Sequence, residues 1–330
     1  MSSVAIIIPM YNEEGQILRT LKAVRAACQQ WQGSSEVLVI DNGSSDNGPQ
    51  LAESLGVRVI DGRGLTIGAM RNLGASLTES DYLAFIDADI EMPAQWLSQC
   101  EATHNEDGSA LIALAMKAPA HAPWYAQVWQ ARQHGFHRPK QRLNWIPSTN
   151  LWLTREAFQR SGGFSSRLRT GEDKAFGLHL HALGYQQQRL SSPVAVNYGY
   201  ERSFSEWCGK ELWRQNNHFR LCQEQQLGFR ALRFPLLAFA VALISLLSLG
   251  SYLLWAIQMN QPNPFGWAAL LLALASLSAG GILAARQCLK VRRPGLLLPL
   301  WLLHWVRLHL AAWALALNVL NQHSRRPSRG

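Results

Sequence analysis

The sequence predicts an α/β domain followed by helices that cross a membrane. Short apolar runs that lead into acidic or turn-forming residues recur in the first 90 residues of the 330-residue chain. Such runs are typical of buried strands in an α/β sheet. Long apolar runs with almost no charge follow Gly228, and each has about the ~20 residues that a helix needs to cross a bilayer. We therefore expect a globular domain over residues 1–228 and a membrane domain over residues 229–330.

Three apolar runs predict three strands of one sheet, at residues 4–9, 37–40 and 82–86. Apolar residues at helical spacing predict a helix over residues 17–27 between the first two strands. The three strands lead into the clusters Tyr11-Asn12-Glu13-Glu14, Asp41-Asn42-Gly43-Ser44-Ser45-Asp46 and Asp87-Ala88-Asp89. Turn chemistry alone could explain each cluster. Because carboxyl ends of parallel strands line one edge of a sheet, we expect all three to face one cleft.

Two aspartates one residue apart, Asp87 and Asp89, end the third predicted strand. Carboxylates in this arrangement can share a hard divalent cation that still has room for phosphate oxygens. The alternative is a turn with solvated aspartates.

A fourth acidic cluster, Thr170-Gly171-Glu172-Asp173-Lys174, opens a predicted helix with apolar residues at Phe176, Leu180 and Leu183. Acidic residues are also common in the first turn of ordinary helices, so this cluster alone does not indicate a site.

Together the four clusters resemble the family-2 glycosyltransferases, which have the GT-A fold, a Rossmann-like fold of nucleotide-diphospho-sugar transferases. The resemblance covers about residues 3–200 and rests on Pro9-Met10-Tyr11-Asn12-Glu13-Glu14, Asp41-Asn42-Gly43-Ser44-Ser45-Asp46, Asp87-Ala88-Asp89 and Gly171-Glu172-Asp173. It implies an inverting sugar transfer from a nucleotide-diphosphate sugar, with Mg²⁺ or Mn²⁺ as the cofactor.

The resemblance also implies which residues bind the nucleotide. Pro9, Tyr11 and Glu13 would frame the nucleoside, with Asn12 among them, and Asp41 would contact the base or the ribose. Arg71 would lie near the nucleotide and its diphosphate, where its fixed charge suits phosphate oxygens. Its alternative role is a surface arginine on a helix over residues 67–77.

For the reaction itself, the resemblance implies that Asp87 faces the nucleotide sugar and that Asp89, with Asp87, binds the metal. Asp173 would be the general base, with Glu172 beside it. The chemistry requires such groups, because a divalent cation neutralises a diphosphate leaving group. An acceptor hydroxyl is a poor nucleophile and needs a carboxylate to take its proton.

One motif departs from the family pattern. Processive members carry Gln-x-x-Arg-Trp after the base, and the comparable place here reads Gln215-Asn216-Asn217-His218-Phe219. A degenerate acceptor element and a plain amphipathic helix on the membrane are both open. The sequence therefore argues against polymer-forming processivity.

The membrane domain is predicted to contain two spans, at about residues 232–257 and 266–285. A third apolar segment at about residues 295–320 contains His304, Arg307 and His309 among tryptophans. Ionisable groups are costly inside a bilayer, and tryptophan-rich amphipathic helices lie at its surface. The third segment is therefore expected to be interfacial or re-entrant, with a third full span as the alternative.

Loop charges predict how the spans are oriented. Basic residues flank the pair of spans, whereas the connector at residues 258–265 has no charge, which predicts a hairpin with both ends in the cytoplasm. No signal peptide is visible, since residues 5–9 are too short. We expect a multi-pass protein of the inner (cytoplasmic) membrane with a cytosolic catalytic domain.

The formal net charge of +9 is expected to attract anionic membrane lipids rather than nucleic acid. Much of this charge lies beside the predicted spans, and no nucleic-acid-binding module accompanies it. A basic segment from Arg132 to Arg142 could hold a lipid phosphate, or could be a solvated loop. The five cysteines show no metal-ligand spacing.

The favoured function is a glycosyltransferase acting on a lipid-linked acceptor, either a polyprenyl phosphate or a saccharide on a polyprenyl diphosphate. Bacterial envelope polysaccharide or exopolysaccharide biosynthesis is the context that the resemblance implies. A nucleotidyltransferase of similar fold and a non-catalytic nucleotide-sugar-binding membrane protein are the alternatives. The sequence leaves the sugar, the nucleotide, the linkage and the oligomeric state open.

Overall fold

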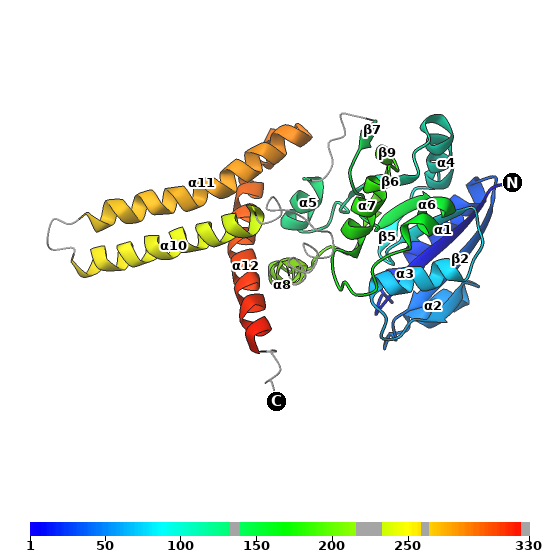
Figure 1. The fold of residues 1–330 in the computed structure, drawn as a ribbon, viewed down its shortest axis with the longest axis horizontal. Coiled ribbons are helices and arrows are strands. Elements are labelled where there is room, and N and C mark those ends of the chain that lie inside the picture. The colour runs from blue at the N-terminus through cyan, green and yellow to red at the C-terminus, as the bar shows by residue number, and fades with distance from the viewer. Residues whose placement is uncertain (133–138, 216–232, 259–263, 325–330) are drawn as a thin grey trace. The chain divides into compact units, whose positions relative to one another are not determined.

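The computed structural model describes residues 1–132, 139–215, 233–258 and 264–324. These residues belong to two compact units, the sheet unit (Met1–Ala122 with Phe136–Tyr200) and the helical unit (Pro123–Gly135 with Glu201–Gly330). Figure 1 shows the elements of both units. The predicted boundary at Gly228 lies outside the described residues and stays a prediction.

The sheet unit is built on one mixed sheet. In the described residues its order is β3-β2-β1-β4-β8-β6-β9-β5, and β7 pairs with β9. The strands are β1 (Ser3–Met10), β2 (Ser34–Asp41), β3 (Arg58–Asp61), β4 (Tyr82–Ile86), β5 (Ile90–Glu91), β6 (Leu111–Lys117), β7 (Lys140–Arg142), β8 (Asn150–Thr154) and β9 (Gln187–Asn197). The three predicted strands are confirmed as β1, β2 and β4.

Strands β3, β2, β1 and β4 run parallel, whereas β8 is antiparallel to both β4 and β6. The register pairs Met10 with Asp41 at the ends of β1 and β2, and Ile7 with Phe85 between β1 and β4. The carboxyl ends of these three strands therefore share one edge of the sheet, as the sequence predicts.

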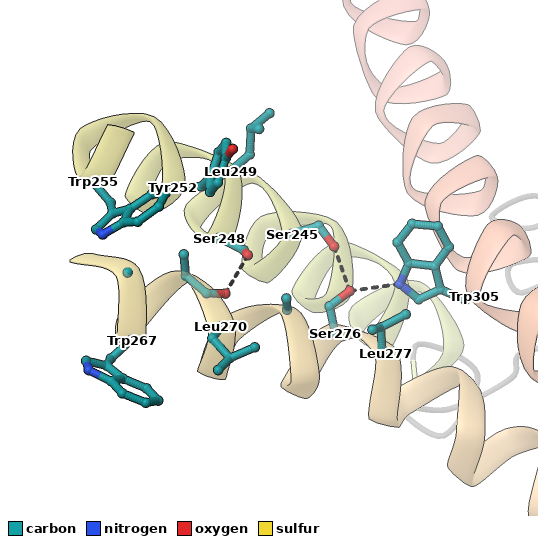
Figure 2. A pocket seen from close by; sticks show the side chains of 13 residues that line it. Ser245, Ser248, Leu249, Tyr252, Trp255, Trp267, Leu270, Ser276, Leu277 and Trp305 are labelled. Atoms are coloured by element: carbon teal, nitrogen blue, oxygen red, sulfur yellow. Dashed lines mark hydrogen bonds between the residues drawn. The ribbon is translucent and has the colours of Figure 1, made fainter. Parts of the chain in front are cut away.

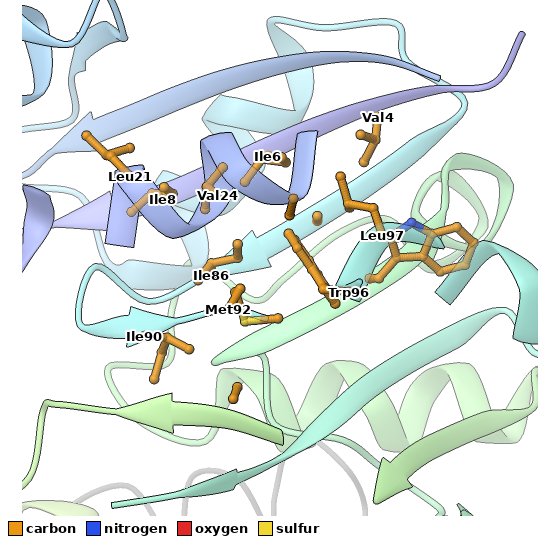
Figure 3. Packing of buried hydrophobic residues seen from close by; sticks show 14 of the residues in the cluster. Val4, Ile6, Ile8, Leu21, Val24, Ile86, Ile90, Met92, Trp96 and Leu97 are labelled. Atoms are coloured by element: carbon orange, nitrogen blue, oxygen red, sulfur yellow. The ribbon is translucent and has the colours of Figure 1, made fainter. Parts of the chain in front are cut away.

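Helices cover both faces of the sheet. They are α1 (Ile17–Gln30), α2 (Gly48–Ser54), α3 (Ile67–Ser76), α4 (Trp96–Asp107), α6 (Arg155–Ser161) and α7 (Glu172–Ala182). Successive strand residues point to opposite faces. Accordingly Ile6 and Ile8 of β1 pack with α1 and α4 (Figure 3), whereas Ile7 packs in a second cluster with α3, α6 and α7. A strand buried on both faces explains the unbroken apolar run.

The helical unit contains α5 (Trp124–Ala131), α8 (Phe204–Gln215), α10 (Arg233–Ile257), α11 (Phe265–Val291), a short 3₁₀ turn (Pro294–Leu296) and α12 (Leu297–Ser324). Both α5 and α8 pack against α12. In the described residues, three segments are long and apolar enough to cross a membrane: Arg233–Ile257, Phe265–Val291 and Pro294–Leu317. The first two match the predicted spans, and the interfacial placement of the third stays a prediction.

Candidate functional site

The loops that follow β1 and β2 are joined by reciprocal hydrogen bonds. The backbone N–H of Asn12 donates to Ser44 Oγ (2.9 Å), and the N–H of Ser45 donates to Asn12 Oδ1 (2.8 Å). The N–H of Glu14 donates to Asp46 Oδ2 (2.8 Å). Asn12 has a φ of 55°, a left-handed conformation that asparagine tolerates better than most residues. The first two sequence clusters therefore form one structure.

Asp41 holds the second of these loops in shape. Its Oδ2 accepts from the N–H groups of Gly43 (3.0 Å) and Ser44 (3.1 Å), and its Oδ1 accepts from Ser44 Oγ (2.5 Å). A side chain that bonds its own backbone two residues on is typical of aspartate at turns. Contact between Asp41 and a base or ribose stays a prediction.

Three other predicted nucleotide residues differ in exposure and role. Pro9 is buried within β1 opposite Ile40. The Glu13 carbonyl accepts from the N–H groups of Gln16 and Ile17, both at 2.9 Å, and so begins α1. Tyr11 is 59% exposed, which leaves its ring available for stacking against a planar ligand.

Arg71 of α3 connects the end of β4 to the start of α7. Its side chain is 2% exposed, and its Nη2 and Nη1 atoms lie 3.0 Å from Asp87 Oδ1 and 2.8 Å from Glu172 Oε1. The guanidinium also lies over the Phe164 ring, 5.4 Å from its centroid. The structure thus joins Asp87 and Glu172 through a residue that the sequence places near phosphates. The phosphate role stays a prediction.

Gly68 and Asn72, which are not among the predicted site residues, hold α3 against the segment before α7. A Cβ on Gly68 would lie 2.7 Å from the Ser165 carbonyl oxygen, so only glycine permits this approach without a shift. Asn72 Nδ2 donates to the Phe164 carbonyl (2.8 Å), and the Phe164 N–H donates to Asn72 Oδ1 (2.9 Å). Their position beside Arg71 in the sequence is the signal that could have revealed them.

Asp173 lies half-buried in the first turn of α7. Burial, followed by the neighbouring Glu172 carboxylate, raises the pKa of Asp173 to about 7, although Arg71 and the Lys174 N–H act in the opposite direction. A carboxylate with a pKa near neutrality is suited to accept a proton from a hydroxyl.

Asp89 lies in the turn between β4 and β5, beside the end of β9. Its carbonyl oxygen accepts from the Tyr198 N–H (2.9 Å). A Cβ built on Gly199 would overlap the Asp89 carboxylate, so the absence of a side chain there gives Asp89 its position. The sequence gives no signal for Gly199, because a glycine carries no chemistry of its own.

The profile of the family described as "Glycosyl transferase family 2" matches residues 5–172, slightly more than half of the chain. The chain belongs to this glycosyltransferase family. This membership favours the glycosyltransferase prediction over the nucleotidyltransferase alternative.

Curated relatives of this chain match over shorter segments. It is 27% identical over 114 residues to an undecaprenyl-phosphate 4-deoxy-4-formamido-L-arabinose transferase of Proteus mirabilis, covering 32% of this chain and 35% of the relative. It is 32% identical over 115 residues to glycosyltransferase AglE of Haloferax volcanii, covering 33% and 38%. The alignments therefore span about a third of each relative's length.

A solved structure with a similar fold is the mannosyltransferase PcManGT of Pyrobaculum calidifontis, in complex with GDP-Man and Mn²⁺. Its TM-score is 0.57 at 17% sequence identity, and the match covers 97% of this chain and 87% of that one. The predicted GT-A fold is confirmed.

Metal binding by Asp87 and Asp89 stays a prediction. No group of three or more histidine, cysteine or acidic side chains among the described residues is arranged to enclose an ion. Asp87 and Asp89 would supply carboxylate oxygens from one side, and hard divalent cations accept phosphate and water oxygens in their remaining positions. The motif at residues 216–219 lies outside the described residues.

Proposed function

We propose that this protein is an inverting, metal-dependent glycosyltransferase that moves a sugar from a nucleotide-diphosphate sugar to a lipid-linked acceptor. The single observation that carries the proposal is the buried Arg71, which holds Asp87 at the end of β4 and Glu172 beside Asp173. This contact supports the proposal, because it joins Asp87 to Glu172, which precedes the predicted base Asp173 in the sequence.

On the donor side, the joined loops after β1 and β2 would bind the nucleoside, with Tyr11 stacking on the base. Asp89 and Asp87 would hold Mg²⁺ or Mn²⁺. A divalent cation bound there would neutralise the charge that develops on the diphosphate leaving group. Arg71 would keep the Asp87 carboxylate oriented toward the donor.

On the acceptor side, Asp173 would take the proton of the attacking hydroxyl. The acceptor oxygen forms a bond to the anomeric carbon while the bond from that carbon to the diphosphate breaks, so the anomeric configuration inverts. Glu172 would act as a positioning residue, because its carboxylate is bound by Arg71 and its charge raises the pKa of Asp173.

The lipid-linked acceptor is supported by the membrane-spanning length of three described segments and by the undecaprenyl-phosphate transferases among the relatives. Either a polyprenyl phosphate or a saccharide on a polyprenyl diphosphate would place the acceptor at the membrane. The spans would anchor the protein in the cytoplasmic membrane with the sheet unit in the cytosol. Envelope polysaccharide or exopolysaccharide assembly is the corresponding process.

The test is a screen of radiolabelled nucleotide sugars with the full chain and membrane lipid extract. Label should enter the lipid phase with one donor class and require Mn²⁺ or Mg²⁺. Asp89→Asn should abolish the transfer, and Asp173→Asn should slow it ~10²–10⁴-fold. Label that enters lipid equally in chelator, or with both variants, would contradict the proposal.

A further inference from the structure

Helix α1 carries one polar side chain on its buried face, that of Thr20. The buried positions of the helix are Ile17, Thr20, Leu21, Val24 and Ala27, which have the i, i+3, i+4 spacing of a stripe that faces a core. Leu21 and Val24 pack in one cluster with Ile86 and Ile90, the residues on either side of Asp87-Ala88-Asp89 (Figure 3). Thr20 is 1% exposed, so its hydroxyl needs a hydrogen-bond partner inside the protein.

The partner of Thr20 lies in the acidic turn, as we call residues 87–90, which lead from β4 into β5. Thr20 Oγ1 donates to the backbone carbonyl of Ala88 (2.8 Å), and both residues are buried. The turn is closed by the Ile90 N–H, which donates to the Asp87 carbonyl (3.2 Å), as in a β-turn. The Thr20 hydroxyl therefore fixes the centre of the turn, between the two aspartates that are predicted to bind the metal.

Arg19 contacts Tyr198, which is itself bonded to the acidic turn. The guanidinium carbon of Arg19 lies 3.8 Å from the centroid of the Tyr198 ring, and the Tyr198 N–H donates to the Asp89 carbonyl (2.9 Å). Arg19 Nε also lies 3.9 Å from Glu91 Oε2, in an exposed pair of a kind that contributes little by itself. Two consecutive residues of α1 are therefore joined to the turn, Thr20 directly and Arg19 through Tyr198.

We propose that α1 positions the carboxylates of Asp87 and Asp89, with Thr20 as the buried anchor of the acidic turn and Arg19 as the exposed one. Both would act as positioning residues, through the backbone of the turn. Groups that hold metal ligands in place typically change metal affinity ~10- to 100-fold when they are removed. That these carboxylates bind a metal rests on the proposed function, whereas the support of the turn by α1 does not.

The first test is a binding measurement on the full chain in detergent. GDP and, separately, UDP are titrated at a series of Mn²⁺ concentrations, which gives the Mn²⁺ concentration for half-maximal nucleotide binding. Thr20→Val removes the hydroxyl and keeps the shape of the side chain, so this concentration should rise ~10- to 100-fold. Thr20→Ser keeps the hydroxyl and should give a value close to that of the wild type.

Two other variants control for the loss of a buried hydroxyl. Thr103 of α4 is also 1% exposed, but its hydroxyl donates within its own helix, to the Gln99 carbonyl (2.8 Å). In the helical unit, the Ser276 hydroxyl joins three helices, because it accepts from Trp305 Nε1 (3.0 Å) and lies 2.6 Å from Ser245 Oγ (Figure 2). Thr103→Val and Ser276→Ala should both leave the Mn²⁺ requirement unchanged.

The exposed anchor is tested in the same assay. Arg19→Met removes the cation from the face of the Tyr198 ring, and an exposed contact of this kind typically contributes ~2- to 5-fold to an equilibrium constant. The Mn²⁺ requirement should rise by about that factor, and Arg19→Lys, which keeps a cation, should raise it less. Lys22→Met removes an exposed cation of the same helix and should not change it.

Hydrogen exchange measures the acidic turn without metal or nucleotide. The Ile90 and Tyr198 N–H groups are bonded to carbonyls of the turn, so both should exchange faster in Thr20→Val, relative to the amides of β1, which report opening of the sheet. Unchanged exchange at these two amides, or equal acceleration in β1, would overturn the proposal. So would a Mn²⁺ requirement that rises as much in Thr103→Val or Ser276→Ala as in Thr20→Val.

Failure of the proposed function would give a different result. Wild-type nucleotide binding that does not depend on Mn²⁺, or that keeps the same dependence in Asp89→Asn, would refute the metal site and leave the exchange result for α1 standing. A Mn²⁺ dependence that Asp89→Asn abolishes and Thr20→Val does not change would refute the role of α1 alone.

Discussion

Asp173 has a pKa raised to about 7 by burial and by the adjacent Glu172 carboxylate. A general base accepts a proton only when it is ionised, so we expect kcat/KM to fall as the pH drops below about 7. Asp173→Asn should cost ~10²–10⁴-fold in rate. Glu172→Gln removes the neighbouring negative charge, lowers the pKa of Asp173, and should move the acid limb to lower pH.

The pH profile of sugar transfer is the measurement for this prediction, and the exposed Glu156→Gln is the control that should leave the limb in place. Normal turnover by Asp173→Asn together with an inactive Glu172→Gln would assign the base to Glu172 instead.

Because Gly199 has no side chain, the Asp89 carboxylate can lie directly beside its backbone. A methyl group at this position would overlap the Asp89 carboxylate, so Gly199→Ala should displace the predicted metal ligand. Changes that misorient a metal ligand typically cost ~10- to 100-fold in metal affinity. The Mn²⁺ concentration that gives half-maximal activity should rise accordingly.

The control for Gly199→Ala is Gly209→Ala, because a Cβ at Gly209 would meet nothing within 4 Å. An unchanged Mn²⁺ requirement in Gly199→Ala would show that Asp89 is not the ligand, or that it adopts another rotamer without loss.

At the residue scale, the sequence predicts those members of the site whose side chains carry chemistry. Asp87, Glu172 and Asp173 all lie at positions where the structure brings acidic groups together. The partners of Arg71 could not be predicted, because Glu172 is 101 residues away in the chain and no local pattern records such a contact. Gly199 and Gly68 are needed because the Asp89 carboxylate and the Ser165 carbonyl oxygen approach them closely. Such approaches arise only in the folded chain, so the sequence could not predict them.

At the scale of elements, the ion pairs of Arg71 with Asp87 and Glu172 connect α3 to the end of β4 and to α7. Arg71→Met would leave the buried Glu172 carboxylate without its partner, and removing one member of a buried ion pair typically costs about 3–5 kcal/mol. We expect the free energy of unfolding of the full chain in detergent to fall by about that amount, with loss of transfer activity.

Arg160→Met is the matched control for this change, because its ion pair with Glu156 is exposed and exposed pairs contribute about 0–1 kcal/mol. Equal destabilisation by the two variants would show that the Arg71 contacts do not stabilise the fold in the way its burial indicates.

The elements that the sequence predicts are those with a strong local pattern. The strands β1, β2 and β4 are unbroken apolar runs, and α1 and α3 begin at the residues where the helical spacing begins. The antiparallel insertion of β8 between β4 and β6 was not predicted. Whether a strand pairs parallel or antiparallel depends on the strand beside it in the folded sheet. A buried apolar run has the same pattern in both cases.

At the scale of the whole chain, the topology of α12 decides on which side of the membrane the carboxyl terminus lies. Its apolar segment is long enough to cross, whereas the charge pattern of the sequence predicts that both ends of the α10–α11 hairpin and the tail lie in the cytoplasm. We expect reporter fusions after residue 324 to give a cytoplasmic signal.

A reporter inserted in the connector between α10 and α11 should give an extracytoplasmic signal and serves as the internal reference. An extracytoplasmic tail would show that α12 crosses the bilayer and that the interfacial prediction is wrong. The sequence could predict that α10 and α11 span the membrane, because long uncharged apolar runs are typical of spanning helices. The charged and aromatic residues of α12 are compatible with either a spanning or an interfacial helix.

The antiparallel strand β8 has a consequence for how often the backbone at the end of β4 opens to solvent. Strand β4 is paired on both sides, by β1 and β8, and the Asp87 N–H donates to the Thr149 carbonyl (3.0 Å). Its amide hydrogen can exchange with solvent only when that pairing opens, and openings of central strands approach the free energy of global unfolding. Native-state hydrogen exchange should therefore find Asp87 among the slowest amides, whether or not a donor is bound. The amides of Asn12 and Ser45, held by exposed side-chain bonds, should exchange quickly and slow when a nucleotide binds.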